Sequence, residues 1–427
     1  MSSLRPVLTL SAVLSAGITS AQDLVIDEII VTATRRAENL RDVPIAVSAL
    51  TGDAIVEAGV KDIRDIAGQI PGLSIKSRGD TEASVFIRGI GSQAPGIGAD
   101  PAVGIYIDGL YAARGTNATA AFFDIVRVEV IKGPQGTLFG RNASAGAISL
   151  ITNKPEIGKN YGSALVGFGN EGQQKYEFIY NADVSDRVAF RIGARHDRRD
   201  GLYRNSLNGD ELNGRENSNV RVALHYEGSD SWASDFSYEY TESSSKAAFV
   251  GDPNFYDDDV PLQDVPADQD LESSRLNWTN SWDLRDNLIL TSITGYFDLD
   301  VNVTPVDADT LEIPLLTFEE PQTAKMFSQE FRLNGSSGSM DWFIGGSYIE
   351  EDLTFRNSLV VDEFIAAAFL GQNALDVGNM NACDGGIDFD GTGDVAFPVC
   401  LAPAIETPSG KNKTTSRAVY GDVTWQM

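Results

Sequence analysis

The sequence contains two cysteines, Cys383 and Cys400, and their side chains allow one covalent chemistry, a disulfide bond. In an oxidising compartment such a pair is more often bonded than left as free thiols. Two cysteines alone make neither a zinc site nor a redox motif. If the chain is exported, we therefore predict a Cys383–Cys400 disulfide within one long loop.

The loop between these cysteines is acidic and rich in glycine. Its distinctive residues are Asp384, Asp388, Asp390, Gly391, Gly393 and Asp394. Carboxylates among glycine turns resemble a calcium loop, yet their spacing misses the EF-hand pattern and no terminal Glu follows. We interpret the segment as a solvated acidic loop, with calcium binding as the alternative. Whether the chain has a metal site therefore stays unknown at this point.

Catalytic patterns are not visible in the sequence. His196 and His225 are the only histidines, both fall in strand-like segments, and there is no nucleophile elbow. Residues 89–94 match the letters of the dinucleotide fingerprint, but Pro95 and Gly96 break the helix that should follow it. We interpret this stretch as a tight glycine loop, and we predict neither an enzyme nor a cofactor.

The composition narrows the class of protein further. The chain has 427 residues, 33 basic and 61 acidic side chains and a net charge of -28. Nucleic-acid binding needs a basic surface, which this charge does not offer. After the N-terminus no stretch reaches the roughly 18 apolar residues of a transmembrane helix, which excludes a helical membrane protein but not a membrane β-barrel.

The N-terminus has the features of a secretory signal peptide. Arg5 precedes an apolar stretch from residue 7 to 18, and small residues surround Ala21. We predict a signal peptide over residues 1–21 with cleavage after Ala21. A buried N-terminal helix is the alternative.

Charge and hydrophobic periodicity divide the remaining chain near Pro155. Residues 22–155 hold 13 basic and 15 acidic side chains, whereas residues 156–427 hold 19 and 46. The second region alternates apolar and polar residues with period two, which predicts strands wet on one face. We count ten such strands, centred near residues 165, 179, 192, 223, 236, 279, 293, 330, 346 and 421.

The connections between these strands alternate in length. Short turns near residues 186, 230, 286 and 338 alternate with long polar segments at residues 198–218, 242–274, 302–325 and 352–416. This asymmetry, with aromatic residues near strand ends, is typical of an outer-membrane β-barrel. A soluble β-sandwich or propeller is the alternative.

The first region has two short helical signals, at residues 51–55 and 61–66, and five strand-like pieces. This pattern predicts a small α+β domain before the barrel.

Several segments together resemble the TonB-dependent outer-membrane receptors. The stretch Asp27, Glu28, Ile29, Ile30, Val31, Thr32 and Ala33 is similar to a TonB box. Three later stretches resemble the receptor plug: residues 42–48 with 70–73, residues 86–89, and residues 128–155, VEVIKGPQGTLFGRNASAGAISLITNKP. Residues 328–335 and 341–352 resemble strands of the family's barrel.

The resemblance implies a domain order and a fold class. These are a signal peptide (residues 1–21), a TonB box and linker (22–41), an α+β plug domain (42–155) and the N-terminal part of an antiparallel transmembrane β-barrel (156–427). The family's barrels have about 22 strands, and about ten strands make too narrow a cylinder to enclose a plug. We therefore expect an incomplete barrel and a truncated chain.

The resemblance also implies partners and site residues. An extended heptapeptide at a free terminus offers unpaired backbone groups for strand addition, and the implied partner is periplasmic TonB with ExbB and ExbD. A disordered terminus is the alternative. The implied plug motif comprises Arg88, Gly89, Gly133, Pro134, Gln135, Gly136, Gly140 and Arg141. In it residues 133–136 suit a tight turn presenting backbone groups, and Arg88 and Arg141 face either barrel-wall carboxylates or local plug acids.

The function expected from the resemblance is uptake of a scarce small ligand from outside the cell, such as a ferric siderophore, through the outer membrane of a Gram-negative bacterium. Uptake of a carbohydrate or vitamin is an alternative. A signal-transducing receptor is a second alternative, disfavoured because only residues 22–26 separate the predicted cleavage site from the TonB box. An exported β-rich enzyme is a third, and it would need a catalytic constellation.

Overall fold

The computed structural model describes residues 30–32, 35, 38–60, 62–78, 82–92, 101–112, 122–246, 263–265, 267–307, 316–356, 358–361, 386–387, 397–398, 404–406 and 409–425. The predicted signal peptide at residues 1–21 lies outside these residues, as do Cys383 and Cys400 with most of the loop between them.

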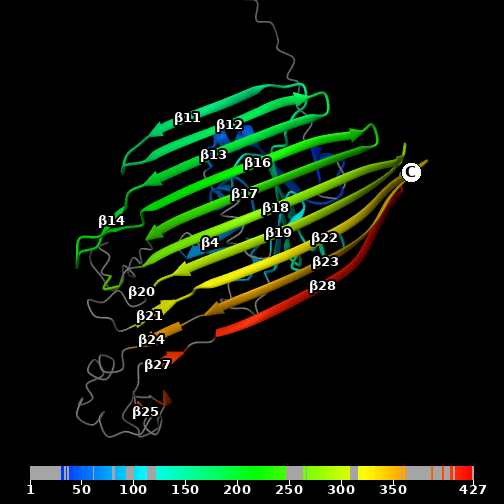
Figure 1. Ribbon diagram of the computed structural model, residues 1–427. Coiled ribbons are helices and arrows are strands. Elements are labelled where there is room, and N and C mark those ends of the chain that lie inside the picture. The colour runs from blue at the N-terminus through cyan, green and yellow to red at the C-terminus, as the bar shows by residue number, and fades with distance from the viewer. Residues whose placement is uncertain are drawn as a thin grey trace, which may run out of the picture.

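The largest element is a ten-stranded antiparallel sheet whose strands follow one another in chain order (Figure 1). Its strands are β11 (Tyr161–Phe168), β12 (Gln174–Ser185), β13 (Val188–Arg199), β16 (Arg215–Ser229), β17 (Trp232–Lys246), β18 (Asp268–Arg285), β19 (Leu288–Val303), β22 (Gln322–Ser337), β23 (Met340–Arg356) and β28 (Ser409–Trp425). Each contains one of the ten predicted strand centres. The sequence prediction of these strands is therefore confirmed.

The predicted difference between the two ends of the sheet is also present. Two-residue turns such as Asp186–Arg187 and Asp286–Asn287 join strands at the end where the C-terminus lies, and the longer connections gather at the other end (Figure 1). In the first hairpin, β11 to β12, Glu171 and Gly172 have φ of +53° and +58°. Two successive positive φ values match the right-handed strand twist, which explains the tight turn.

The longer connections carry small strands of their own. They are β14 (Tyr203–Arg204) paired with β15 (Glu211–Leu212), a four-stranded sheet of β20 (Val306–Asp307), β21 (Leu316–Glu319), β24 (Ser358–Val361) and β27 (Ala404–Glu406), and β25 (Gly386–Ile387) paired with β26 (Phe397–Pro398).

The N-terminal domain, described between residues 38 and 152, contains two sheets. The five-stranded sheet has the order β3 (Val47–Thr51), β9 (Ile125–Lys132), β10 (Gly146–Thr152), β7 (Val103–Ile107) and β8 (Leu110–Ala112), and the three-stranded sheet consists of β4 (Leu73–Arg78), β5 (Glu82–Ile87) and β6 (Ile90–Gly91). Three short helical segments accompany them: α1 (Gly52–Glu57), the 3-10 turn η1 (Asp65–Gly68) and α3 (Gly136–Phe139). Ahead of these elements, β1 (Ile30–Val31) pairs with β2 (Glu38–Asn39).

The helical predictions in this domain are met in part. Thr51 caps α1 by accepting a hydrogen bond from the Ala54 amide, as a threonine before a helix is expected to do. The second signal, at residues 61–66, predicts a helix, but the structure forms only the 3-10 turn η1, which begins at Asp65. The reason is local: the Asp62 carboxylate binds the Arg64 amide and guanidinium and stabilises a turn there instead.

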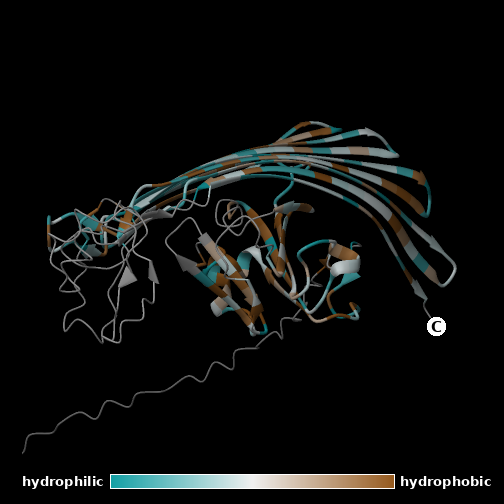
Figure 2. Ribbon diagram, turned by 90° about the horizontal axis from the view of Figure 1, so that it is seen from below, coloured by the Kyte–Doolittle hydropathy of each residue, from teal (hydrophilic) through white to brown (hydrophobic). Residues whose placement is uncertain are grey.

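Two hydrophobic cores lie on opposite faces of the five-stranded sheet. On one face, Val128, Val130, Ile148 and Leu150 pack with residues of α1, η1 and the three-stranded sheet. On the other face, Ile131 and Ala147 belong to a cluster that also contains Leu299 and other residues of the ten-stranded sheet. Since this second core joins both domains, it holds the N-terminal domain against the concave face of the curved large sheet (Figure 2).

The large sheet is polar on its inner face and apolar on its outer face. Arg221, Glu239 and Asn277 are buried on the inner face, whereas Val220, Tyr238 and Trp278 are exposed on the outer face. None of the helices within the described ranges has the length and apolar character needed to cross a bilayer.

Candidate functional site: the interface between the domain and the sheet

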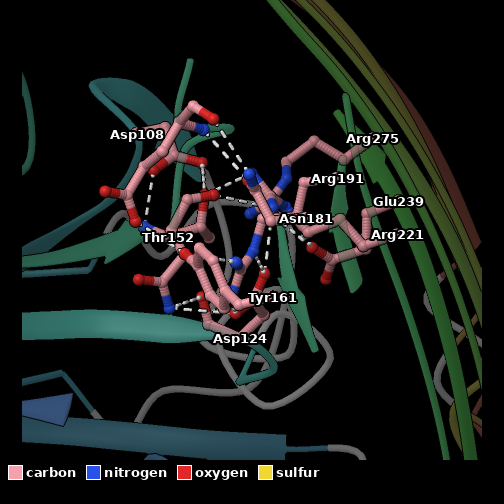
Figure 3. Close-up of polar contacts among 11 residues, drawn as sticks. Asp108, Asp124, Thr152, Tyr161, Asn181, Arg191, Arg221, Glu239 and Arg275 are labelled. Carbon is pink, nitrogen blue, oxygen red and sulfur yellow. Dashed lines mark hydrogen bonds and ion pairs between the residues drawn. The ribbon is translucent and has the colours of Figure 1, made fainter. Parts of the chain in front are cut away.

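The interface centres on the carboxylate of Asp124, just before β9. Arg191 of β13 donates two hydrogen bonds to it, of 2.7 and 2.8 Å, and Arg221 of β16 lies 3.3 Å away (Figure 3). The side chains of all three are at most 6% exposed. A buried carboxylate held in a fork by one guanidinium and contacted by a second is a strong, directional attachment.

Arg221 extends this network to the end of β10 and along the sheet. It donates hydrogen bonds to the Asn153 carbonyl at 2.9 Å and to the Thr152 hydroxyl at 2.6 Å. Its Nε lies 3.9 Å from Glu239 of β17, whose other partner is Arg275 of β18 at 2.7 Å. The inner face of four adjacent strands thus contributes charged groups to a single network (Figure 3).

Asp108 links a second turn of the domain, between β7 and β8, to this network. Its carboxylate accepts hydrogen bonds from the amide and hydroxyl of Thr152, each 2.8 Å long. Its backbone carbonyl accepts a 3.2 Å bond from the Asn277 amide group on β18. The β7–β8 turn and the end of β10 are therefore positioned together against the wall.

The linker between the domain and the sheet is also held by polar contacts. The fully buried Asn181 of β12 donates to the carbonyls of Glu156 and Lys159 and accepts from the Glu156 amide. Lys154 forms a 2.6 Å ion pair with Asp235, which is also bonded to His225. These bonds satisfy backbone groups that the linker, as it passes from the domain to the sheet, would otherwise leave unpaired.

Two wall glycines allow apolar side chains of the domain to approach the sheet closely. A Cβ on Gly193 would lie 2.8 Å from the Phe123 ring, and one on Gly295 would lie 2.5 Å from Leu110. Neither glycine has a positive φ. Space, and not backbone conformation, therefore explains glycine at both positions.

A second contact area links the domain to strands β22 and β23. Arg141 lies 3.5 Å from Glu351, and Arg35 lies 4.0 Å from Glu330. Arg35 also lies over the rings of Tyr106 and Phe139, at 5.1 and 4.7 Å from their centroids. These two ion pairs are longer than those at Asp124.

Tyr106 is the buried centre of that aromatic group. Its hydroxyl donates a hydrogen bond to the Phe139 carbonyl. Burial raises the pKa of the Tyr106 phenol, so the group stays protonated and remains a donor across the physiological range.

The segment predicted as a TonB box is only partly described, and that part is docked onto the domain. Asp27, Glu28, Ile29 and Ala33 lie outside the described residues. Val31 is 0% exposed, and the Thr32 amide donates to the carboxylate of Glu129. The expectation of unpaired backbone groups is therefore wrong for Ile30 and Val31, because they pair with β2.

A cavity of about 600 Å³ lies beside this segment, between the domain and the sheet. Its lining includes Thr32 and Arg127 from the domain side and Arg221, Asp235 and Arg332 from the sheet. The interface therefore contains enough empty space for side chains to rearrange.

The predicted plug-motif residues lie in two separate places. Arg88 and Gly89, with φ of +52° and +79°, form the tight turn between β5 and β6. Arg88 is exposed, and in the described part of the chain it has no ion pair with the sheet, unlike Arg141. Which carboxylate Arg88 faces therefore stays a prediction, whereas Arg141 meets Glu351 of the sheet. The glycine-loop interpretation of residues 89–92 agrees with this turn.

The segment Gly133, Pro134, Gln135 and Gly136 leads into α3, and two of its amides bond within the domain. The Gly133 amide donates to the Ala145 carbonyl, and the Gln135 amide donates to the Ala143 carbonyl. These two amides are therefore satisfied within the domain. Gly140, with φ of +77°, ends the helix and precedes Arg141.

Sequence reasoning missed the residues that form the main network. The available signal was the arginines on the polar faces of predicted strands, such as Arg191 and Arg221, since charged residues on a covered face need partners. Asp124 gave no local signal. Among the described residues no group of three His, Cys, Asp or Glu side chains is arranged to hold a metal ion.

Comparison with known proteins identifies the domain. The family model described as TonB-dependent Receptor Plug Domain matches residues 39–147. The vitamin B12 transporter BtuB of Vibrio vulnificus is 33% identical over 159 residues, covering 36% of this chain and 25% of that protein. The chain thus matches about a quarter of the length of this curated relative.

Solved structures share the fold of this chain over about half of their own length, at low sequence identity. The ferric yersiniabactin uptake receptor FyuA of Yersinia pestis superimposes with a TM-score of 0.71 at 19% identity, covering 89% of this chain and 54% of that one. The ferripyoverdine receptor of the outer membrane of Pseudomonas aeruginosa gives a TM-score of 0.65 at 15% identity, covering 91% and 50%. Residues 39–147 thus match the plug domain of the TonB-dependent receptors, and this domain packs against the concave face of a sheet that shares the fold of the solved receptors.

Proposed function

We propose that this chain serves the energised uptake of a scarce ligand, a ferric siderophore or a similar iron complex, through the outer membrane of a Gram-negative bacterium. In this proposal the signal peptide directs export, and TonB, powered through ExbB and ExbD, acts on the segment from Asp27 to Ala33.

The observation that carries the proposal is the buried polar network within the interface between plug and wall. Asp124, Arg191, Arg221, Glu239 and Arg275 make buried contacts that hold the plug in one register. Charged groups of this kind can exchange a protein partner for water when a domain moves, whereas an entirely apolar interface would resist separation. The cavity of about 600 Å³ beside them lies on the same boundary.

The iron ligand is supported by the solved receptors that share the fold, for ferric yersiniabactin and for ferripyoverdine. Uptake of a corrinoid is the second candidate, because the vitamin B12 transporter is 33% identical over the plug region. Fold alone does not specify the ligand.

An uptake assay in the source bacterium tests both candidates. A strain with the gene deleted is compared with the wild type for accumulation of radiolabelled iron, supplied as ferric siderophores, and of labelled cobalamin. We expect the deletion to lower iron accumulation from at least one siderophore and to leave cobalamin uptake unchanged. The reverse pattern would establish the second candidate, and no change for any compound would contradict the proposal.

The role of the N-terminal segment has a separate test. Proline at Val31 removes a backbone donor and restricts φ, which should prevent strand addition to TonB. Cells carrying Val31→Pro should still bind the ligand at the surface but accumulate it only to the level of a strain without TonB. Normal accumulation would show that this segment is not the site on which TonB acts during uptake.

A further inference from the structure

The cavity between the plug and the sheet is large enough for a small molecule. Its volume of about 600 Å³ lies within the usual size of ligand pockets, roughly 300–1,000 Å³. Its lining combines apolar side chains, such as Phe139 of the plug and Phe236 and Ile293 of the sheet, with charged ones. Lys154 lines one end with a side chain that is 64% exposed, so the cavity borders solvent there.

Charge in the lining is unbalanced. Among the described lining residues five are cationic and three are acidic. Each of the three acids already has a partner, namely Thr152 for Asp108, Lys154 for Asp235 and Lys159 for Glu156. A pocket with an excess of one sign attracts ligands of the other sign. The lining therefore favours an anionic ligand.

One of the cations has a donor that nothing in the described part of the chain uses. Arg127 and Arg221 donate hydrogen bonds of 2.7 and 2.6 Å to neighbouring side chains. In Arg332 of β22, by contrast, Nη1 lies 3.6 Å from Glu330, beyond hydrogen-bond distance, and the buried Nε has no hydrogen-bond partner. A buried donor of this kind costs free energy unless an acceptor reaches it.

Arg332 lies in a corner of the cavity that is positive and aromatic. Arg35 also lines the cavity, and its Nη1 lies 4.0 Å from the other oxygen of Glu330. Two guanidinium groups thus share one carboxylate at long distances. The rings of Tyr106 and Phe139, which line the same cavity, lie beside Arg35. A planar carboxylate suits a guanidinium group, and an aromatic body suits these rings.

We propose that this cavity is a binding site for a small aromatic carboxylate, whose anionic group accepts hydrogen bonds from Arg332 and whose ring packs against Tyr106 and Phe139. Such a ligand touches the plug and the sheet at once, so its binding stabilises their contact by mass action. The site does not depend on the function proposed above. If that function holds, the bound ligand opposes movement of the plug.

The test uses the purified chain in detergent micelles and the probe para-(trifluoromethyl)benzoate, followed by fluorine NMR. Micelles without protein are the blank, and para-(trifluoromethyl)benzamide is the neutral analogue. A charge-assisted hydrogen bond shifts an equilibrium by about tenfold or more. The benzoate should therefore bind at least about tenfold more tightly than the benzamide. Arg332→Gln, which removes the charge and keeps a polar side chain, should weaken benzoate binding by about tenfold.

Arg198→Gln provides the matched control, because it makes the same chemical change on β13 at a side chain that is 53% exposed. Its affinity for the benzoate should equal that of the wild type. Arg332→Lys keeps a cation and should restore most of the binding. If Arg332→Gln fails to fold, Val126→Trp replaces it. Val126 lines the cavity and is 36% exposed, so a larger ring there occupies the space and leaves the cations in place.

Each result decides the proposal. Benzoate binding that falls in Arg332→Gln or Val126→Trp, and not in the control, supports it. No binding beyond the micelle blank shows a cavity that holds water only and overturns it. Equal binding by wild type and Arg332→Gln overturns the role of Arg332, and equal binding of the benzamide overturns the anionic class. Because none of these readouts is uptake, the proposed function can fail while this site stands.

Discussion

At the scale of single residues, Asp124 has the greatest structural consequence. It is the only plug carboxylate in the described ranges shown to contact two arginines of the sheet, Arg191 and Arg221. Both guanidinium groups are buried, so each depends on its acidic partners for compensation of its charge. Glu239 shares Arg221 but pairs more closely with Arg275, and it does not replace Asp124.

The substitution Asp124→Asn tests this dependence. It keeps the shape of the side chain and removes the charge, leaving Arg191 without its closest carboxylate. Breaking a buried ion pair leaves the remaining charge buried without compensation. We therefore expect the free energy of unfolding to fall by about 3 kcal/mol. Urea unfolding followed by tryptophan fluorescence measures the loss, and Asp230→Asn, at an exposed turn, serves as the control. A loss equal to that of the control would show that the pair does not stabilise the interface.

At the scale of elements, the fit between β8 of the plug and β19 of the wall depends on a glycine. A Cβ at Gly295 would lie 2.5 Å from Leu110 and 2.7 Å from the Ser328 hydroxyl. Both distances are too short for carbon contacts, so one strand must shift or the side chains must leave their preferred rotamers.

We therefore expect Gly295→Ala to destabilise the chain by about 1–2 kcal/mol, as overpacked sites do. The matched control is Gly346→Ala on β23, where the nearest atom to an added Cβ is the Ala418 carbonyl at 3.7 Å. Both substitutions reduce backbone freedom in the unfolded chain equally, so the difference in urea midpoint between them isolates the clash. Equal midpoints would mean that Leu110 repacks without cost.

The turn before η1 gives a prediction for pH. Burial by itself raises the pKa of Asp62, but hydrogen bonds from Arg64 and the charges of Arg64 and Arg215 outweigh it, and the net pKa lies below the ordinary 3.8. A lowered pKa in the folded state adds stability that is complete above the unfolded value and is lost as the pH falls through the folded value.

Asp62→Asn should consequently be less stable than the wild type by about 1 kcal/mol at pH 7. The difference should shrink progressively below about pH 4, where the unfolded carboxyl becomes protonated. Unfolding midpoints at pH 7, 5, 4 and 3 provide the measurement. A difference that stays constant down to pH 3 would assign the effect to packing instead of charge.

At the scale of the whole molecule, charge is distributed according to environment. The chain has a net charge of -28, yet the inner wall facing the plug presents Arg191, Arg221 and Arg275. Most of the excess acidity lies after residue 155, where 46 acidic side chains stand against 19 basic ones. Arg191 and Arg221 thus lie where the plug supplies Asp124, whereas Arg275 pairs with Glu239 of the sheet itself.

Export of the whole chain predicts a disulfide between Cys383 and Cys400, which lie outside the described residues. Mass spectrometry of unreduced protein from the cell envelope, with thiols trapped at lysis, should detect the linked peptides. Protein retained in the cytoplasm by deletion of residues 1–21 serves as the reduced control. Free thiols in the exported protein would refute the prediction.

Most of the large sheet was predictable from the sequence because its signals are local. Alternation of apolar and polar residues specifies which face of a strand is wet, and turn residues such as Glu171 and Gly172 specify where a hairpin closes. These signals placed all ten strands. In the plug they placed β4, β5, β7, β9 and β10 but not the shorter strands β3, β6 and β8, and they favoured a full helix where the Asp62 turn competes.

The interface was not predictable in the same way, because its partners are distant in sequence. Asp124 meets Arg191 and Arg221 across 67 and 97 residues, and Thr32 meets Glu129 across 97. Each pairing depends on the register of several strands and on how the plug sits on the sheet, which no local pattern encodes. The sequence by itself determined the strands of the large sheet and the family resemblance. Only the tertiary structure decided which acid each arginine meets and that the N-terminal segment is docked, because those choices follow from long-range packing.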